Sequence, residues 1–410
     1  IRPRDWSSDV CSSDLPHDPG VLAMPGAGGA LGGFFVSGVL LAYLGAILPS
    51  WGHHVQSDYW MIGLYFVALI AGVLSAVRTA PQWLEKKGLG WTLTSACGLA
   101  AGALLYLAFF SPPSVAWWRL RGVLLVGMAA GVLHTAIFHA ISPIYRHDPA
   151  ATVNLAGILF GLGCFAVALL ISRMFYTYTA SAIQVWIALI PGFFAVGYAR
   201  VRFVPLVSSP PPAAHVLIEE FKNPNALLLS LILFFQLGNE WAMAGWLPLF
   251  LSQRLGMSPS AAIMMLAFYW LALLVGRVVA QWILPRFRHG RLLTTCVLVS
   301  MFACVILLAT DNSFGAATGV LLLGGALAPI YPLVVEKIGA VFPSYHPGFY
   351  NGIFSLAMAG GMLAPCTLGY LAWMLDVRAV MAVPLIGSAA VAILLIALWI
   401  EGRLRGYLQP

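Results

Sequence analysis

Charged side chains are scarce in this chain. Asp, Glu, Lys and Arg make up 9% of its 410 residues, whereas hydrophobic residues make up 61% and the mean hydropathy is +0.90. About a quarter of the residues of an average soluble domain are charged. The composition therefore excludes such a domain and predicts an integral membrane protein. A nucleic-acid partner is also excluded, because the basic residues behind the net charge of +7 lie between apolar runs and not in one patch.

Paired cysteine motifs and a cleavable signal peptide are also lacking. None of the six cysteines forms a C-x-x-C pair, and all except Cys11 lie in apolar segments, where a thiol acts as a small hydrophobe. We therefore expect no disulfide, no metal site and no cofactor. The first long apolar run, from Leu31, continues as a full span and has no basic region before it, which is not typical of a signal peptide.

Long apolar runs dominate the rest of the chain. A helix needs about 20 apolar residues to cross the hydrocarbon core of a bilayer, and twelve runs meet this requirement. They are predicted at 31–50, 59–79, 90–110, 118–141, 150–172, 182–203, 226–250, 260–285, 291–310, 314–337, 346–373 and 378–401. The expected fold class is an all-α integral membrane protein with twelve transmembrane helices in two six-helix pseudo-repeat bundles.

The loops between these runs predict an orientation. With both termini in the cytoplasm, the cytoplasmic side carries thirteen basic residues near the spans and the other side carries five. This distribution satisfies the positive-inside rule. We expect a multi-pass protein of the inner (plasma) membrane with both termini cytoplasmic.

The predicted domains are a leader at 1–23, a first bundle at 24–203, a cytoplasmic linker at 204–225 and a second bundle at 226–410. The linker contains a Pro-Ser run and a short amphipathic stretch, which is typical of an interfacial connection. The bundles resemble each other weakly, because NLAGILFGLG from Asn154 has a counterpart in NGIFSLAMAGG from Asn351. Such a six-plus-six repeat is typical of transporters that rock two bundles around a central site.

The leader contains DWSSDVCSSDL, residues 5 to 15, which is unlike the rest of the chain. Its aspartates lack the alternating ligands and the central glycine of a calcium loop. A DNA string that resembles a sequencing-library adapter translates to the same eleven residues. We therefore expect this stretch to be adapter-derived and disordered, without a function, and synthesis starting at Met24 to leave activity unchanged.

One carboxylate, Glu240, lies deep inside a predicted span. Gln236, Asn239, Met243 and Trp246 fall within the same 120° sector of that helix, so one face offers amide, carboxyl and indole groups. This mixture suits a polyol, because its hydroxyl groups need hydrogen-bond partners and its C–H face packs against the face of an aromatic ring. The alternative is a polar cluster that holds helices together.

Other predicted site residues lie in the first and second bundles. His134 is a candidate polar or proton-linked group, and its spacing of five from His139 argues against a di-iron site. Asn154, Asn351, Tyr269, Trp270 and Tyr331 are candidate substrate contacts, although each could equally serve packing. Arg121 could attract anions at the outer mouth, or it could be an interfacial arginine.

Two further patterns concern helix packing and bending. The stretch GGALAPIYP in the tenth span contains Pro329 and Pro332, which weaken the helix and predict a gate or a static kink. Glycines four apart, namely Gly98 with Gly102, Gly127 with Gly131 and Gly157 with Gly161, predict close approach of the third, fourth and fifth spans to other helices.

Several stretches resemble the major facilitator superfamily. GNEWAMAGWLPLFL in the seventh span, YWLALLVGR in the eighth, GGALAPIYP in the tenth and NLAGILFGLG in the fifth are similar to the fucose:proton symporter-like group of sugar transporters. The resemblance implies alternating access and symport of a monosaccharide with protons. The chain departs from the family motif after the second span, where Ala76 replaces an aspartate, and only Gly276 and Arg277 retain part of the motif in the second bundle. Arg277 is therefore a candidate gating residue.

We expect a secondary transporter for a sugar or a similar small polar solute, with the proton as candidate coupling ion. No predicted span of the first bundle contains an acidic residue, so coupling would rest on Glu240 or on His134. One alternative is efflux of hydrophobic compounds. A lipid-modifying membrane enzyme is disfavoured, because no acids, histidines or cysteines converge near an interface. Beyond the lipid bilayer and the solute we expect no partner, and we expect a monomer.

Overall fold

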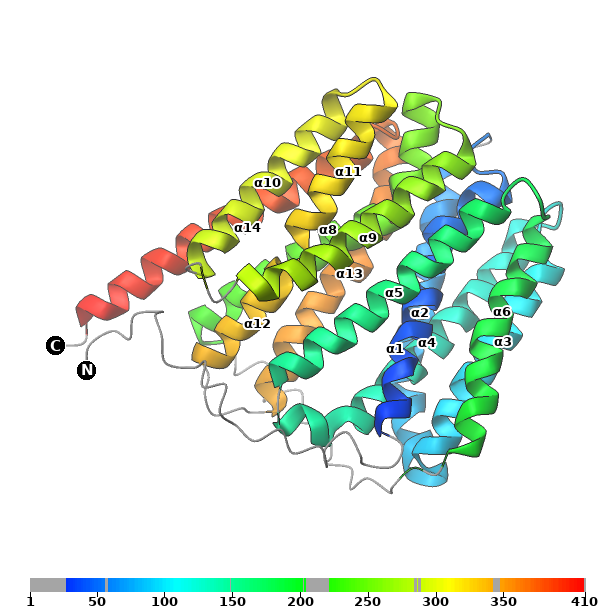
Figure 1. Ribbon diagram of the computed structural model, residues 1–410, viewed down its shortest axis with the longest axis horizontal. Coiled ribbons are helices and arrows are strands. Elements are labelled where there is room, and N and C mark those ends of the chain that lie inside the picture. Colours follow the sequence, from blue (N-terminus) through cyan, green and yellow to red (C-terminus); the bar gives the residue numbers. More distant parts are fainter. Residues whose placement is uncertain are drawn as a thin grey trace.

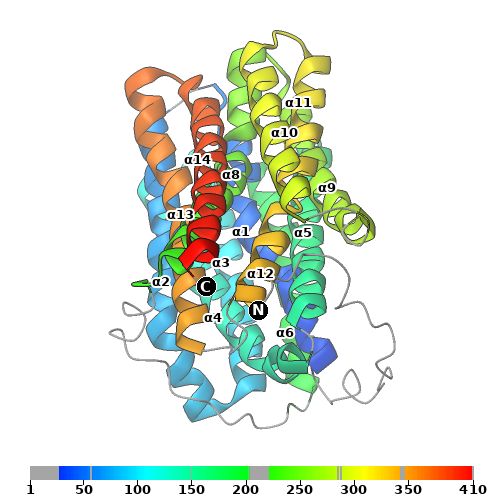
Figure 2. The ribbon, with the colours of Figure 1, turned by 90° about the vertical axis from the view of Figure 1, so that its left-hand side faces the viewer.

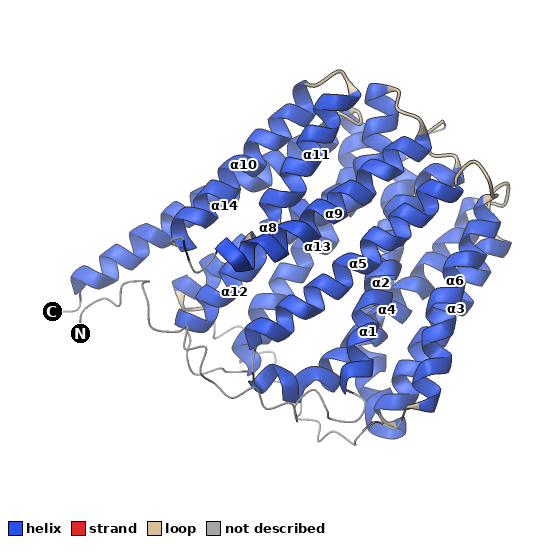
Figure 3. Cartoon of the chain, viewed as in Figure 1, coloured by secondary structure: helices blue, strands red, loops and turns tan. Residues whose placement is uncertain are grey.

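The computed structural model describes residues 27–55, 58–147, 149–201, 203, 221–283, 286, 289–341 and 347–408. Helices and short turns account for all of these residues (Figure 3). The predicted leader at 1–23 and nearly all of the predicted linker, including its amphipathic stretch from Leu217 to Glu220, lie outside this part of the chain.

In the part of the first half that the structure describes, six long helices and a short 3-10 helix have these bounds: α1 (Ala27–Ile47), η1 (Leu48–Trp51), α2 (Tyr59–Lys87), α3 (Leu89–Phe109), α4 (Ala116–His147), α5 (Pro149–Met174) and α6 (Ala180–Arg200). The described residues of the second half form these α-helices: α8 (Pro224–Leu255), α9 (Pro259–Ile283), α10 (His289–Ala309), α11 (Ser313–Leu327), α12 (Ile330–Val341), α13 (Pro347–Leu375) and α14 (Ala379–Leu408).

Twelve helical segments of the described chain are long and apolar enough to cross a membrane, which confirms the predicted number of spans. The first combines α1 with η1, and the tenth combines α11 with α12. The tenth span is interrupted at residues 328 and 329, where the prolines and glycines of GGALAPIYP predicted a weak point. Because Pro329 has no backbone N–H and crowds the preceding turn, the α-helix stops at Leu327 and restarts at Ile330.

Each half is a bundle with its own helix pairs. In the first half α2 packs along α4, α3 along α6 and α1 along α5, and in the second half α13 and α14 pack along α8 while α11 packs on α9 and α10. The halves meet where α5 contacts α9, α2 contacts α13 and α1 contacts α8. Figure 1 shows the halves beside each other, with α5 next to α9 along their common boundary, and Figure 2 shows the second half from its outer face, in front of the first.

Hydrogen bonds join the two halves at one end of the molecule, which carries η1 and the turns after α5 and α8 and which we call the predicted outer end. Ser172 Oγ on α5 donates to the Ser260 carbonyl on α9, and Ser260 Oγ donates back to the Ser172 carbonyl, both at 2.8 Å. Tyr59 Oη on α2 donates to Gln253 Oε1 on α8 at 2.7 Å. The halves are therefore in direct contact at this end.

Glycines allow the helix backbones of the two halves to approach each other closely. A Cβ atom added to Gly45 on α1 would lie 2.0 Å from the Ala244 carbonyl oxygen on α8, and one added to Gly369 on α13 would lie 2.5 Å from Gly63 Cα on α2. Real Cβ contacts are longer than either distance, so these backbones approach each other only because the side chains are absent.

The predicted glycine pairs behave differently from one another. A Cβ on Gly127 of α4 would lie 2.0 Å from the Leu69 carbonyl oxygen on α2, and one on Gly131 would lie 2.6 Å from Ala76 Cβ, which confirms close packing there. Gly98 and Gly102 on α3 have no atom within 4 Å of such a position, so the prediction for the third span is wrong. These two glycines lie on the exposed face of α3, where spacing alone does not specify a neighbour.

Candidate functional site

Glu240 lies in the middle of α8, a helix of 32 residues, and its side chain is buried at 4% relative exposure. Sixteen residues from the N-terminal end of this helix, at 1.5 Å per residue, place it about 24 Å along the axis. At this depth an ionised carboxylate is costly, by about 2.5–3.5 kcal/mol on insertion scales, unless other groups compensate its charge.

Two side chains compensate the charge of Glu240. Arg277 Nη2 of α9 lies 3.7 Å from Glu240 Oε2, and Gln236 Nε2, one turn earlier on α8, donates to Glu240 Oε1 at 3.0 Å. Gln236 Nε2 also donates to the Leu327 carbonyl at 2.9 Å. Leu327 is the last residue of α11, so its carbonyl lacks a partner within that helix and is available to the amide. The break in the tenth span thus helps to orient the group that holds Glu240.

Arg277 also connects the second half to the first. Its Nη1 donates to the Gly157 carbonyl of α5 at 3.0 Å, while its side chain is only 12% exposed. A Cβ on Gly157 would lie 2.6 Å from Nη1, so the absence of a side chain at this position makes room for the guanidinium. One arginine therefore contacts a carboxylate in its own half and a backbone carbonyl in the other.

Aromatic rings surround this ion pair. Tyr269 Oη donates to the backbone carbonyl of Glu240 at 3.5 Å, and the Trp270 ring lies 5.4 Å from the Tyr269 ring and 6.0 Å from the Trp241 ring. Phe160 of α5 lies 6.0 Å from Trp241 across the boundary between the halves. Trp270 Nε1 is buried and has no hydrogen-bond partner among the described residues. Tyr269 thus contacts Glu240 directly, and Trp270 packs on Tyr269 and on Trp241, the residue that follows Glu240.

Asn239 and Trp246 share the buried face of α8 but contact other helices. Asn239 Nδ2 donates to Ser388 Oγ of α14 at 3.2 Å, and Trp246 Nε1 donates to the Pro365 carbonyl of α13 at 2.9 Å. The Trp246 ring also lies 6.3 Å from the Phe66 ring of the first half. The structure therefore brings Gln236, but not these two side chains, into direct contact with the Glu240 carboxylate.

Of the remaining predicted site residues, His134 lies apart from this group. His134 Nδ1 lies 3.3 Å from Ser37 Oγ of α1, and its ring meets Phe34 and Phe138 edge-on. Pro329 is buried at the break before α12, and Tyr331 follows in the first turn of that helix. The side chains of Asn154 and Asn351 are not among those that the structure describes.

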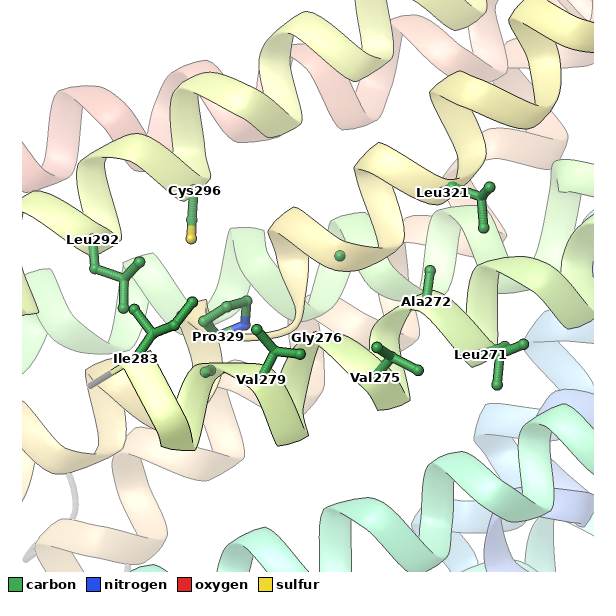
Figure 4. Close-up of a pocket in the computed structure, with 12 residues that line it drawn as sticks. Leu271, Ala272, Val275, Gly276, Val279, Ile283, Leu292, Cys296, Leu321 and Pro329 are labelled. Carbon is green, nitrogen blue, oxygen red and sulfur yellow. The ribbon is translucent and has the colours of Figure 1, made fainter. Parts of the chain in front are cut away.

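An apolar groove of about 510 Å³ lies beside the break in the tenth span, between α9, α10 and α11. Figure 4 shows Leu292 and Cys296 of α10 facing Pro329 and the side chains of α9. Apart from Pro329, the residues that line this groove are not among the predicted site residues, and none of them is charged. The groove has no polar group other than a thiol to orient a hydroxylated solute, so we do not include it in the candidate site.

A second buried polar group, which we call the Arg119 cluster, comprises Tyr43, Trp51, Tyr65, Arg119 and Gln184, near the predicted outer end of the first half. Arg119 is 6% exposed, and its Nε donates to Tyr65 Oη at 2.9 Å. Its Cζ lies 5.5 Å from the centre of the Trp51 ring. The neighbouring Arg121, for which an anion-attracting role was predicted, is exposed and lies over the Trp118 ring at 4.5 Å.

Comparison with known sequences identifies transporters. The sequence model of the Major Facilitator Superfamily matches residues 229–407. An uncharacterised MFS-type transporter of Yersinia pestis is 23% identical over 317 residues, which cover 74% of this chain and 77% of the relative. The glucose/mannose transporter GlcP of Bacillus subtilis is 20% identical over 352 residues, which cover 82% and 85%.

Solved structures show the same architecture. The nucleoside transporter NupG superposes with a TM-score of 0.68 at 14% identity, over 91% of this chain and 99% of that one. The fucose:proton symporter of E. coli superposes with a TM-score of 0.60 at 16% identity, over 91% and 98%. The predicted fold class and the predicted resemblance are confirmed: the chain has the major facilitator fold, is similar to the fucose:proton symporter-like sugar transporters, and matches the sequence model of the superfamily over most of its second half.

Proposed function

We propose that this protein is a secondary transporter of the plasma membrane that moves a sugar, a nucleoside or a similar polyhydroxylated solute by alternating access, with both termini cytoplasmic. The proposed coupling carboxylate is Glu240, and the proposed coupling ion is the proton. The observation that carries the proposal is the placement of Glu240, buried in the middle of α8 and paired with an arginine that also contacts the other half.

The chemistry of the site supports a polyhydroxylated solute. Amide, carboxylate and guanidinium groups offer donors and acceptors to hydroxyl groups, and the rings of Trp241, Tyr269 and Trp270 offer flat apolar surfaces to a sugar ring or a base. The names of the similar proteins agree with this class, since they include a glucose/mannose transporter, a fucose:proton symporter and a nucleoside transporter.

The contacts of Arg277 suggest how a proton would be coupled to movement. Protonation of Glu240 removes the negative charge that holds Nη2 of Arg277, and the guanidinium then depends on the Gly157 carbonyl and on the solute for partners. The balance of contacts between the halves therefore changes with the protonation of one residue in the second half. In this mechanism Gln236 keeps the carboxyl group oriented in both protonation states, because its amide also donates to Leu327.

The test is uptake into proteoliposomes of labelled sugars and nucleosides, with and without an imposed proton gradient. For the accepted solute, we expect Glu240→Gln to abolish gradient-driven accumulation while exchange of solute across the membrane persists, because glutamine keeps the shape but cannot carry the proton. The matched control is Asp311→Asn, which changes an exposed carboxylate at the end of α10.

Two results would contradict the proposal. Accumulation by Glu240→Gln equal to that of the wild type, with the same pH dependence, would exclude Glu240 as the coupling residue. Uptake of lipophilic cations, with none of the sugars or nucleosides carried, would favour efflux of hydrophobic compounds instead.

A further inference from the structure

Among the residues that the structure describes, the guanidinium of Arg119 has no carboxylate partner. Arg254 and Arg277, whose side chains are each 12% exposed, lie 3.3 Å from Asp311 and 3.7 Å from Glu240, respectively. Arg119 is buried, and no carboxylate lies within 4 Å of it among the described residues. Asp58, whose charge acts on Tyr65, is exposed and caps α2 through the Met61 amide.

Neutral groups provide all the contacts that Arg119 makes in the described part of the chain. Its Nε donates to Tyr65 Oη at 2.9 Å and its Nη1 to the Ser114 carbonyl at 3.3 Å, and its Cζ lies 5.5 Å and 6.0 Å from the centres of the Trp51 and Tyr65 rings. Ring faces and carbonyls attract a cation but leave its formal charge in place. A buried charge of this kind is costly until an opposite charge is bound.

Unpartnered polar atoms surround the same guanidinium. Trp51 Nε1, which can only donate, is buried without a hydrogen-bond partner among the described residues, and Tyr43 Oη is buried with Gln184 and Arg119 as its polar neighbours. Ser111 Oγ donates to Gln184 Oε1 at 2.9 Å, and Gln184 Nε2 has no hydrogen-bond acceptor in the described structure. The cluster therefore combines a positive charge with the Trp51 N–H, which has no acceptor among the described residues, and with the hydroxyl group of Tyr43.

We propose that the Arg119 cluster binds a small anion, held by the guanidinium and by the N–H and O–H donors of Trp51 and Tyr43. A buried water molecule could accept these hydrogen bonds, but it would leave the charge of Arg119 uncompensated. The anion can come from two sources with the same chemistry: a free ion such as chloride, or the carboxylate of a transported solute. The inference concerns the first half only and is independent of the coupling role proposed for Glu240.

The experiment measures the melting temperature of the purified full-length protein in detergent against anion concentration at constant ionic strength. Chloride is titrated against isethionate in one series, and glucuronate is compared with neutral glucose in a second. A ligand that binds only the folded state raises the melting temperature in a saturable way, by about 3 °C or more at a hundred times its dissociation constant. A rise with chloride identifies a free anion, and a rise with glucuronate alone identifies the carboxylate of a solute.

Three variants make the test specific. Arg119→Met removes the charge and should abolish the rise, whereas Arg121→Met, two residues away on the exposed side of α4, should keep it. Trp51→Phe keeps an aromatic ring beside Arg119 but removes the indole N–H. It should weaken anion binding about tenfold. This variant tests the site even if Arg119→Met does not fold. The proposal is overturned if no anion gives a saturable rise in the wild type, or if the rise persists unchanged in Arg119→Met or Trp51→Phe.

Discussion

The Arg277 side chain contacts groups in both halves of the protein. It lies 3.7 Å from a buried carboxylate and 3.0 Å from a carbonyl of the opposite half, while its Nε has no partner among the described residues. Removal of one member of a buried ion pair leaves the other charge uncompensated, which costs more than removal of both. The two members of the pair should therefore depend strongly on each other.

This dependence can be measured as a double-mutant cycle. Arg277→Met should lower the stability of the protein by about 3–5 kcal/mol, because Glu240 would remain buried without its counter-charge. Adding Glu240→Gln to Arg277→Met should recover most of this loss, since no charge then remains to be compensated. Melting temperatures in detergent provide the measurement, and Asp311→Asn, at an exposed carboxylate, should change them little. A double variant no more stable than Arg277→Met would contradict the pairing.

At the residue scale, the sequence predicted the carboxylate but not its partner. Glu240 could be identified because ionisable groups within spans are rare. Its contact with Arg277 depends on how α8 and α9 pack, which helical periodicity does not describe. Arg119 could have been identified: at 100° per residue it shares a face with Val123, Val126 and Ala130, all of which are buried, whereas Arg121 does not.

At the scale of elements, the packing of α2 against α4 illustrates what holds each half together. Gly127 brings the backbone of α4 against the Leu69 carbonyl of α2, closer than any side chain would permit. Between membrane helices there is little hydrophobic driving force, so close contacts of this kind supply much of the association energy. Apolar length could predict these helices, but it could not tell which glycines meet a neighbour.

A pair of matched glycine substitutions tests this packing. Gly127→Ala places a methyl group 2.0 Å from a backbone oxygen, so α2 and α4 must separate, and we expect destabilisation by about 1–3 kcal/mol. Gly102→Ala, on α3, meets no atom within 4 Å and should be neutral or slightly stabilising, because alanine favours the helix. The melting temperatures of the two variants provide the comparison. Equal melting temperatures of the two variants would contradict the prediction, because they would show that α2 and α4 accommodate the methyl group without loss of stability.

At the scale of the whole molecule, contacts at the predicted outer end hold the halves together. They include the reciprocal Ser172 and Ser260 hydrogen bonds, the Tyr59 and Gln253 hydrogen bond, and the approach of Gly45 to Ala244. Alternating access, as proposed for this chain, requires these contacts to break when the outer end opens.

Gly45→Ala should favour the state in which these contacts are broken. The added methyl group would lie 2.0 Å from the Ala244 carbonyl oxygen, so it penalises only arrangements in which α1 and α8 touch. We expect faster amide hydrogen exchange in residues 48–62 and 250–258, measured by mass spectrometry. Gly192→Ala on α6, where no atom lies within 4 Å, is the control and should leave exchange unchanged. Unchanged exchange in Gly45→Ala would show that this contact does not limit opening.

The reciprocal serine pair also has an electrical consequence. The described side chains whose hydrogen bonds join the two halves at the predicted outer end are serine, tyrosine and glutamine, and none of these carries a formal charge. Opening that end would move no ionised side chain of this group through the membrane field, which acts on each elementary charge with about 2.3 kcal/mol per 100 mV. The voltage sensitivity of the transport cycle would therefore reside in Glu240, Arg277, the buried Arg119 and the charge of the cargo, and a current recorded during turnover would not report the breaking of these hydrogen bonds.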